Sequence, residues 1–187
     1  ASTDSGTAES EVSIPDLAAY TQHVYVSSST KSEDGSQETV VVSYNADDTT
    51  TTGLGLRIHF DSTQLSVASL EGVFATDNIF SSADARSDDD DGDNDSTTDK
   101  YIEITWASLF GSWPGAVPVD LATITFDIAE GATGSSTINI EKSSNAAGFA
   151  FDGQSHQIAI TGEEATVESQ LSIDSSTGAV SLSTDPN

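Results

Sequence analysis

The regular alternation of apolar and polar residues constrains this fold more than any other feature of the sequence. Its clearest instance is GLGLRIHF, residues 53–60, where every second residue is apolar. This period of two is typical of a strand with one buried face, because successive side chains of a strand point to opposite sides. The face expected to be buried comprises Leu54, Leu56, Ile58 and Phe60. Similar runs occupy residues 23–29, 38–45, 101–106, 121–128, 136–141 and 156–161.

The segments between these runs are rich in turn-forming residues. Clusters such as SEDGSQ, NADDTTTTG and AEGATGSS separate the runs, and no window shows sustained helical periodicity. About nine short strands with one apolar face each predict an all-β fold, an antiparallel β-sandwich of two sheets packed face to face. We expect an N-terminal extension at residues 1–20, the sandwich at 21–163, and a C-terminal extension at 164–187 that contains two strands.

The charge balance argues against several classes of partner. The chain has 31 acidic and 5 basic residues, a formal net charge of −26, and no cysteine. Proteins that bind nucleic acid or anionic membranes present clustered Lys and Arg, so neither partner is expected. No apolar run approaches the roughly 18 residues that a membrane span requires. Self-repulsion at this charge calls for screening salt or bound cations, and we expect an extracellular or cell-surface protein in a saline environment.

The acidic segment DARSDDDDGDNDSTTDKY, residues 84–101, stands out among the expected turns. Counted from Asp91 as position 1, Asp93, Asp95 and Asp99 fall at positions 3, 5 and 9. This is the alternation with which a calcium loop turns oxygen ligands toward one ion. A complete EF-hand loop would have Gly at position 6 and Glu at position 12, where this chain has Ser96 and Ile102. We therefore predict a Ca²⁺ loop without flanking helices, and Thr97 would contribute its backbone carbonyl. The expected ligands are Asp89, Asp91, Asp93, Asp95, Thr97 and Asp99.

Two alternatives to this single calcium site stay open at the level of sequence. An acidic run is often only a solvated loop. The remaining aspartates of the segment, Asp84, Asp88 and Asp90, would serve a second ion or add only to the general field.

The other chemistry-bearing residues lack the arrangement that catalysis requires. Ser155 and His156 are sequence neighbours, and neighbours in a strand point to opposite faces, so they would not form a nucleophile–base pair. The histidines are scattered through the chain and are expected on strand faces or edges. We therefore expect that the protein is not an enzyme.

Two tryptophans lie close together in TWASLFGSWPG, residues 105–115. Trp106 falls on the apolar face of its run and is expected in the core. Trp113 either braces the loop before Pro114 or remains exposed and stacks on a sugar ring, which would make it a ligand-binding residue.

Two stretches resemble a cohesin domain. TTGLGLRIHFDSTQLSVASLEG, residues 51–72, is similar to the opening of that domain, and VDLATITFDIAEGATGSSTINI, residues 119–140, to a later part. The resemblance covers about residues 22–161 and implies a jelly-roll sandwich of about nine strands. It also implies a non-catalytic module that binds dockerins on extracellular assemblies. The acidic segment at residues 84–101 is an insertion relative to ordinary cohesins.

The C-terminal segment LSIDSSTGAVSLSTDPN, residues 171–187, is similar to part of the cadherin-like repeats of large bacterial surface proteins. The calcium motifs of those repeats are absent from this chain. Taken together, the sequence predicts a calcium-stabilised adhesion or assembly module that pairs its edge strands with neighbouring domains or subunits. The alternatives are a module that binds polysaccharide and a cohesin that binds a dockerin-like partner.

Overall fold

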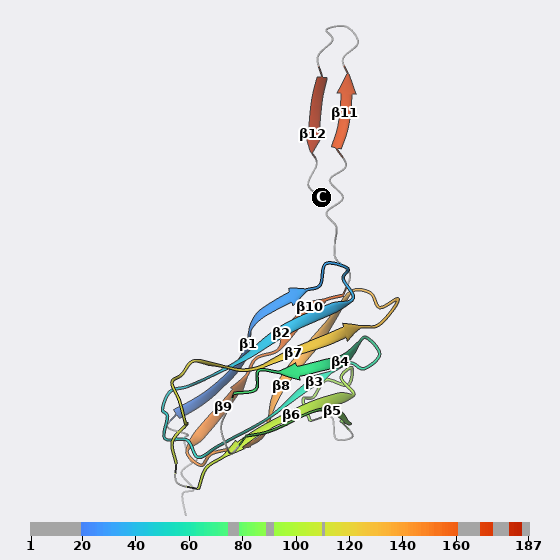
Figure 1. Cartoon of the computed structure of the whole chain (residues 1–187). Helices are drawn as coiled ribbons and strands as arrows, with labels where there is room; N and C mark the ends of the chain where they lie inside the picture. The colour runs from blue at the N-terminus through green and yellow to red at the C-terminus, as the bar shows by residue number, and fades with distance from the viewer. Residues whose placement is uncertain are drawn as a thin grey trace, which may run out of the picture.

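The computed structural model describes residues 20–74, 79–88, 92–109, 111–160, 169–173 and 180–184. Its regular elements are all strands, and most of them form two five-stranded sheets (Figure 1). The first sheet consists, in spatial order, of β4 (Leu65–Glu71), β7 (Val119–Ile128), β2 (Gln37–Ala46), β1 (Tyr20–Lys31) and β9 (Phe149–Gly153). The second consists of β10 (His156–Ala159), β8 (Ser135–Asn145), β3 (Gly53–Phe60), β6 (Lys100–Ala107) and β5 (Ile79–Ser87).

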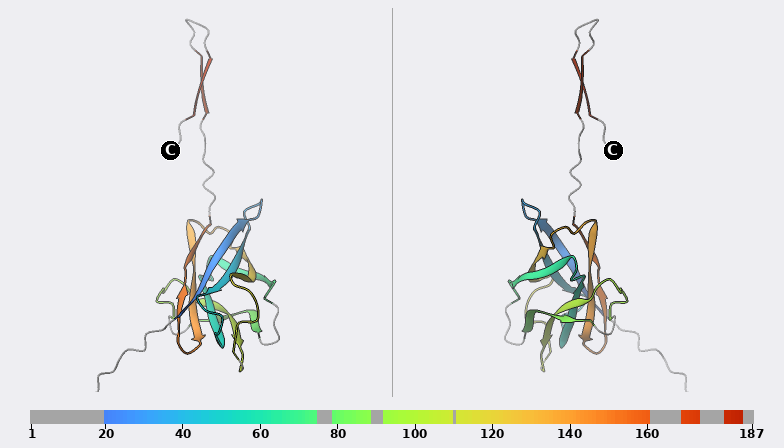
Figure 2. Two further views of the ribbon diagram at one scale, coloured as in Figure 1. Left: turned by 90° about the vertical axis from the view of Figure 1, so that its left-hand side faces the viewer. Right: turned by 90° about the vertical axis from the view of Figure 1, so that its right-hand side faces the viewer.

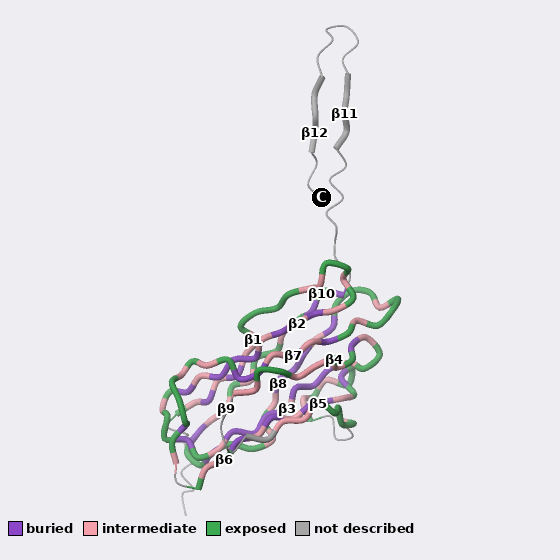
Figure 3. Tube along the Cα trace, in the orientation of Figure 1, coloured by how far each residue is buried: buried purple, intermediate pink, exposed green. Residues whose placement is uncertain are grey.

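The two sheets pack face to face around an apolar core (Figure 2). Buried and less buried residues alternate along the central strands, as the period of two predicts (Figure 3). In β3, the expected inward face of Leu54, Leu56, Ile58 and Phe60 is at most 1% exposed. Burial of each such side chain is worth about 1.5–3 kcal/mol, so the alternation itself stabilises this architecture. The prediction of an all-β sandwich is confirmed.

One pair of strands departs from the antiparallel arrangement that the sequence predicts. Most neighbouring strands are antiparallel, as expected, but β1 and β9 are parallel and place His23 opposite Asp152. Strands β11 (Ser169–Ile173) and β12 (Val180–Thr184) pair with each other, as the C-terminal sequence predicts.

The predicted extension at residues 1–20 lies outside the described residues except for Tyr20, which begins β1. The described residues include no helix with the length and apolar character needed to cross a membrane.

The acidic connection is shorter than the sequence suggested. Residues 84–87 belong to β5, where Arg86 pairs in register with Tyr101 and Ser87 with Lys100. The connection between β5 and β6 is therefore residues 88–99, which we call the aspartate loop, and it joins two neighbouring antiparallel strands.

Candidate functional site

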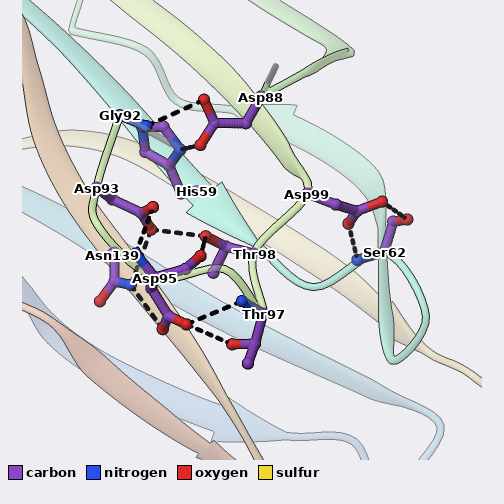
Figure 4. Close-up of polar contacts among 10 residues, drawn as sticks. All are labelled: His59, Ser62, Asp88, Gly92, Asp93, Asp95, Thr97, Thr98, Asp99 and Asn139. Carbon is purple, nitrogen blue, oxygen red and sulfur yellow. Dashed lines mark hydrogen bonds and ion pairs between the residues drawn. The ribbon is translucent and has the colours of Figure 1, made fainter. Parts of the chain in front are cut away.

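The aspartate loop reaches across the outer face of the second sheet. It begins and ends at β5 and β6, yet its side chains contact β3 and β8, the strands beyond β6 in the sheet order (Figure 4). Backbone hydrogen bonds fix its base, because Asp88 N donates to Asp99 O at 3.0 Å and Asp99 N donates to Phe60 O at 3.1 Å. The loop thereby covers outward-facing residues of β3 and β8.

His59 of β3 is the most deeply buried of these covered residues. Its side chain is 0% exposed, and its Nδ1 lies 2.8 Å from Oδ2 of Asp88, whose side chain is 1% exposed. The backbone N–H of Gly92 donates to the other carboxylate oxygen of Asp88 at 3.3 Å. The ring centroids of His59 and Tyr101 are 5.3 Å apart. His59 lies on a strand face, as expected, but the sequence did not indicate that the loop folds over that face and buries it.

Asn139 of β8 holds two further carboxylates of the loop. Its Nδ2 donates to Asp93 Oδ2 at 2.9 Å and to Asp95 Oδ2 at 3.1 Å, while its Oδ1 accepts from Ser155 Oγ at 2.6 Å. Thr98 Oγ1 also donates to Asp93 Oδ2, at 2.7 Å. Asn139 and His59 are register partners on adjacent strands, so the loop carboxylates are held on neighbouring positions of the sheet.

Two carboxylates of the loop are stabilised locally in their charged form. The hydroxyl and backbone N–H of Thr97 donate to Asp95 and hold the pKa of that carboxyl below its usual value. Burial raises the pKa of Asp99, but the hydroxyl and backbone N–H of Ser62 donate to it, and the net pKa is lowered. Hydrogen bonds to an ionised carboxylate favour that state.

The structure brings together only part of the predicted calcium ligand set. Asp93 and Asp95 converge on Asn139, whereas Asp99 points away from them toward Ser62 (Figure 4). Thr97 lies beside Asp95 and contacts it through its hydroxyl. The predicted ligands Asp89 and Asp91 lie outside the described residues. Calcium binding stays a prediction.

Sequence reasoning missed the residues that the sheet contributes to this cluster. A ring nitrogen of His59 and carboxylate oxygens of Asp88 and Asp93 lie within 4.8 Å of one another, an arrangement able to hold a metal ion. The available signal was weak: His59 and Asn139 are polar residues on the outward faces of predicted strands. Nothing in a single sequence says that these strands are adjacent or that the loop covers them.

Comparison with known proteins identifies the fold. No protein-family model matches the chain, and no curated protein sequence matches it either. Among solved structures, the complex of CaDoc0917 with CaCohA2 matches with a TM-score of 0.52 and 16% identity, over 75% of this chain and 100% of the matched one. CaCohA2 comes from Clostridium acetobutylicum. The sandwich has a cohesin-like fold.

Other matched structures are also cohesins. The seventh ScaB type I cohesin of Pseudobacteroides cellulosolvens is 14% identical, over 74% of this chain and 91% of that one, with a TM-score of 0.48. The non-cellulosomal cohesin of the hyperthermophilic archaeon Archaeoglobus fulgidus is 16% identical, over 78% and 95%, with a TM-score of 0.44. The cohesin resemblance inferred from the sequence is confirmed at the level of fold, while the cadherin-like similarity of residues 171–187 stays a prediction.

Trp113 belongs to the core of the cohesin-like sandwich. It is 4% exposed, and its ring centroid lies 4.4 Å from that of Tyr44, 5.0 Å from that of Trp106 and 5.3 Å from that of Phe74. The backbone N–H of Trp113 donates to Thr49 O at 2.7 Å, which ties this loop to the end of the sandwich. Of the two roles predicted for Trp113, sugar stacking is therefore wrong, because its ring is enclosed by other rings.

Proposed function

We propose that this chain is a non-catalytic, extracellular protein-binding module whose partner is a dockerin-type module. The observation that supports the proposal is the match to CaCohA2 over its full length, in a structure where CaCohA2 is complexed with a second protein, CaDoc0917. The fold alone does not fix a function. The partner class comes from the cohesin resemblance, and the experiment below tests it.

The edges of the sandwich favour this partner over edge-strand pairing. Among the edge strands, β9 and β10 have only 5 and 4 residues. The other two are irregular, since the register shifts between Val67 and Ser69 in β4 and between Ser82 and Arg86 in β5. Short and bulged edges are the devices by which proteins avoid edge-to-edge association. A partner is therefore expected to bind a face or an end of the sandwich.

Binding of dockerin modules by isothermal titration calorimetry tests the proposal. We expect saturable binding of at least one member of a dockerin panel, and sedimentation velocity of the chain alone should show a monomer. Failure of every dockerin to bind, together with concentration-dependent self-association, would instead favour the assembly role predicted from the sequence.

A matched pair of variants would locate the binding face. Thr105 of β6 and Thr125 of β7 are half-buried, outward-facing residues in the middle of strands from opposite sheets. Arginine at either position adds bulk and charge to one outer face only. Loss of dockerin binding in only one of Thr105→Arg and Thr125→Arg would assign binding to that face, and binding by both would place the partner at an end of the sandwich. Circular dichroism would confirm that both variants fold.

A further inference from the structure

We propose that His59, Asp88 and Asp93 form a binding site for one divalent transition metal of the zinc class. This site is separate from partner binding and goes beyond it. A ring nitrogen and two carboxylate oxygens from these residues lie within 4.8 Å of one another. Zinc accepts imidazole nitrogen and carboxylate oxygen together, at about 2.0–2.2 Å, which such a cluster reaches by small side-chain movements.

The burial of the cluster is the first argument for a bound cation. The side chains of His59 and Asp88 are 0% and 1% exposed. A charged carboxylate removed from water is costly unless it is paired and hydrogen-bonded. His59 Nδ1 occupies one oxygen of Asp88, but the buried Nε2 has no hydrogen-bond partner among the described residues. The ring therefore has one buried nitrogen without a partner, and one of its two nitrogens lies within 4.8 Å of carboxylate oxygens of both Asp88 and Asp93.

The framework around the cluster is the second argument. His59 lies between its register partners Tyr101 and Asn139, and Asn139 donates to Asp93. The backbone N–H of Gly92 donates to Asp88. Outer contacts of this kind orient metal ligands and are part of most metal sites. Because the three proposed ligands come from β3 and from two points of the loop, one ion would fix the loop to the sheet.

The nearby Arg57 forms no direct ion pair with the cluster in the described part of the chain. The Arg57 guanidinium carbon lies 4.5 Å from the centroid of the Tyr101 ring, over which it stacks. No ion pair joins Arg57 to Asp88 or Asp93 in the described part of the chain. A cation held directly by Asp88 and Asp93 would therefore not displace an ion pair of Arg57.

The ring nitrogen of His59 determines which class of metal ion the cluster favours. Calcium takes six to eight oxygen ligands, whereas imidazole suits zinc and its neighbours among the transition metals. Asp99, one of the oxygen donors predicted for calcium, is directed toward Ser62. The structure thus favours zinc at this cluster over the calcium that the aspartate spacing alone suggested.

Zinc titration of the chelator-stripped full chain, in excess calcium chloride to saturate weak carboxylate sites, tests the proposal. We expect one zinc equivalent to bind by calorimetry, and Asp93→Asn to weaken it by more than about tenfold while keeping an oxygen that accepts from Asn139. The control is His23→Asn, which should bind zinc at the cluster as the wild type does. His23 lies between Asp47 and Asp152 at 3.5 and 3.0 Å, but it is about one third exposed and its two ring nitrogens each face a carboxylate.

A second readout does not depend on any variant folding. In ¹⁵N-resolved spectra of histidine rings, zinc should shift the ring nitrogens of His59 and leave those of His23 unchanged. The proposal is overturned if zinc leaves His59 unshifted, if Asp93→Asn binds zinc as the wild type does, or if calcium alone produces the same shift at His59.

Discussion

The molecule has two buried layers that are built by different physics. The layer between the sheets is apolar and includes residues such as Leu56, Ile58 and Trp113. The layer under the aspartate loop, on the outer face of the second sheet, is polar and contains His59 and Asn139, which are 0% and 9% exposed. Both layers exclude water, yet only the first gains stability simply from doing so.

The difference shows how each layer depends on its partners. Apolar contacts are non-directional, so the core tolerates variation as long as volume is filled. In the polar layer each group needs a particular partner, and an unsatisfied one costs the full desolvation penalty. Truncation of a core side chain leaves volume unfilled, so we expect it to lower the free energy of unfolding strongly. Loss of a polar group under the loop should lower it less and should affect mainly the partners of that group.

The largest expected effect is that of Trp113→Ala. Removing a buried indole that contacts Tyr44, Phe74 and Trp106 should lower the free energy of unfolding by about 3–5 kcal/mol, measured by denaturant unfolding. Leu109 lies in the same connection and is 95% exposed, so Leu109→Ala is the control, with an expected change within about 0.5 kcal/mol. An equal loss in the free energy of unfolding for the two substitutions would show that Trp113 does not stabilise the core layer.

Asn139→Ala should have an intermediate effect. It withdraws the donor that Asp93 and Asp95 share, and we expect a loss of about 1–3 kcal/mol in the free energy of unfolding. Hydrogen exchange of the loop amides should accelerate while that of the core strands does not. Gln37→Ala removes an exposed side chain–carboxylate contact to Asp127 and serves as the comparison, with little expected change. If the core strands exchange as fast as the loop, the two layers are not separate.

The smallest expected effect concerns a carboxylate outside both layers. Hydrogen bonds from Ser32 Oγ and from the backbone and side chain of Ser36 lower the pKa of Asp34 from 3.8 to about 2. Since the folded-state pKa is depressed, its contribution to stability is present above pH 3.8 and is lost as the pH falls toward 2. Carboxyl ¹³C titration should give that midpoint, and Ser32→Ala should raise it. A midpoint near 3.8 in the wild type would contradict the geometry of this turn.

The strands and the core were predictable because their signal is local. The outward and inward faces of β3 follow directly from the alternation in residues 53–60, and Trp106 was placed correctly in the core. Trp113 was ambiguous because it lies outside any alternating run, and its burial depends on rings from three other segments. The parallel pairing of β1 with β9 was likewise invisible, since a sequence does not record which distant strands become neighbours.

By itself, the sequence determined that the chain forms a sandwich of amphipathic strands with one concentrated acidic loop, because both features are written in consecutive residues. Only the tertiary structure decided which residues the loop contacts. His59 and Asp88 are 29 residues apart, and Asn139 and Asp93 are 46 apart. They meet because the sheet order sets β3 beside β8 and the loop folds back across them. Contacts between such distant residues depend on the closure of the whole fold, which no local pattern encodes.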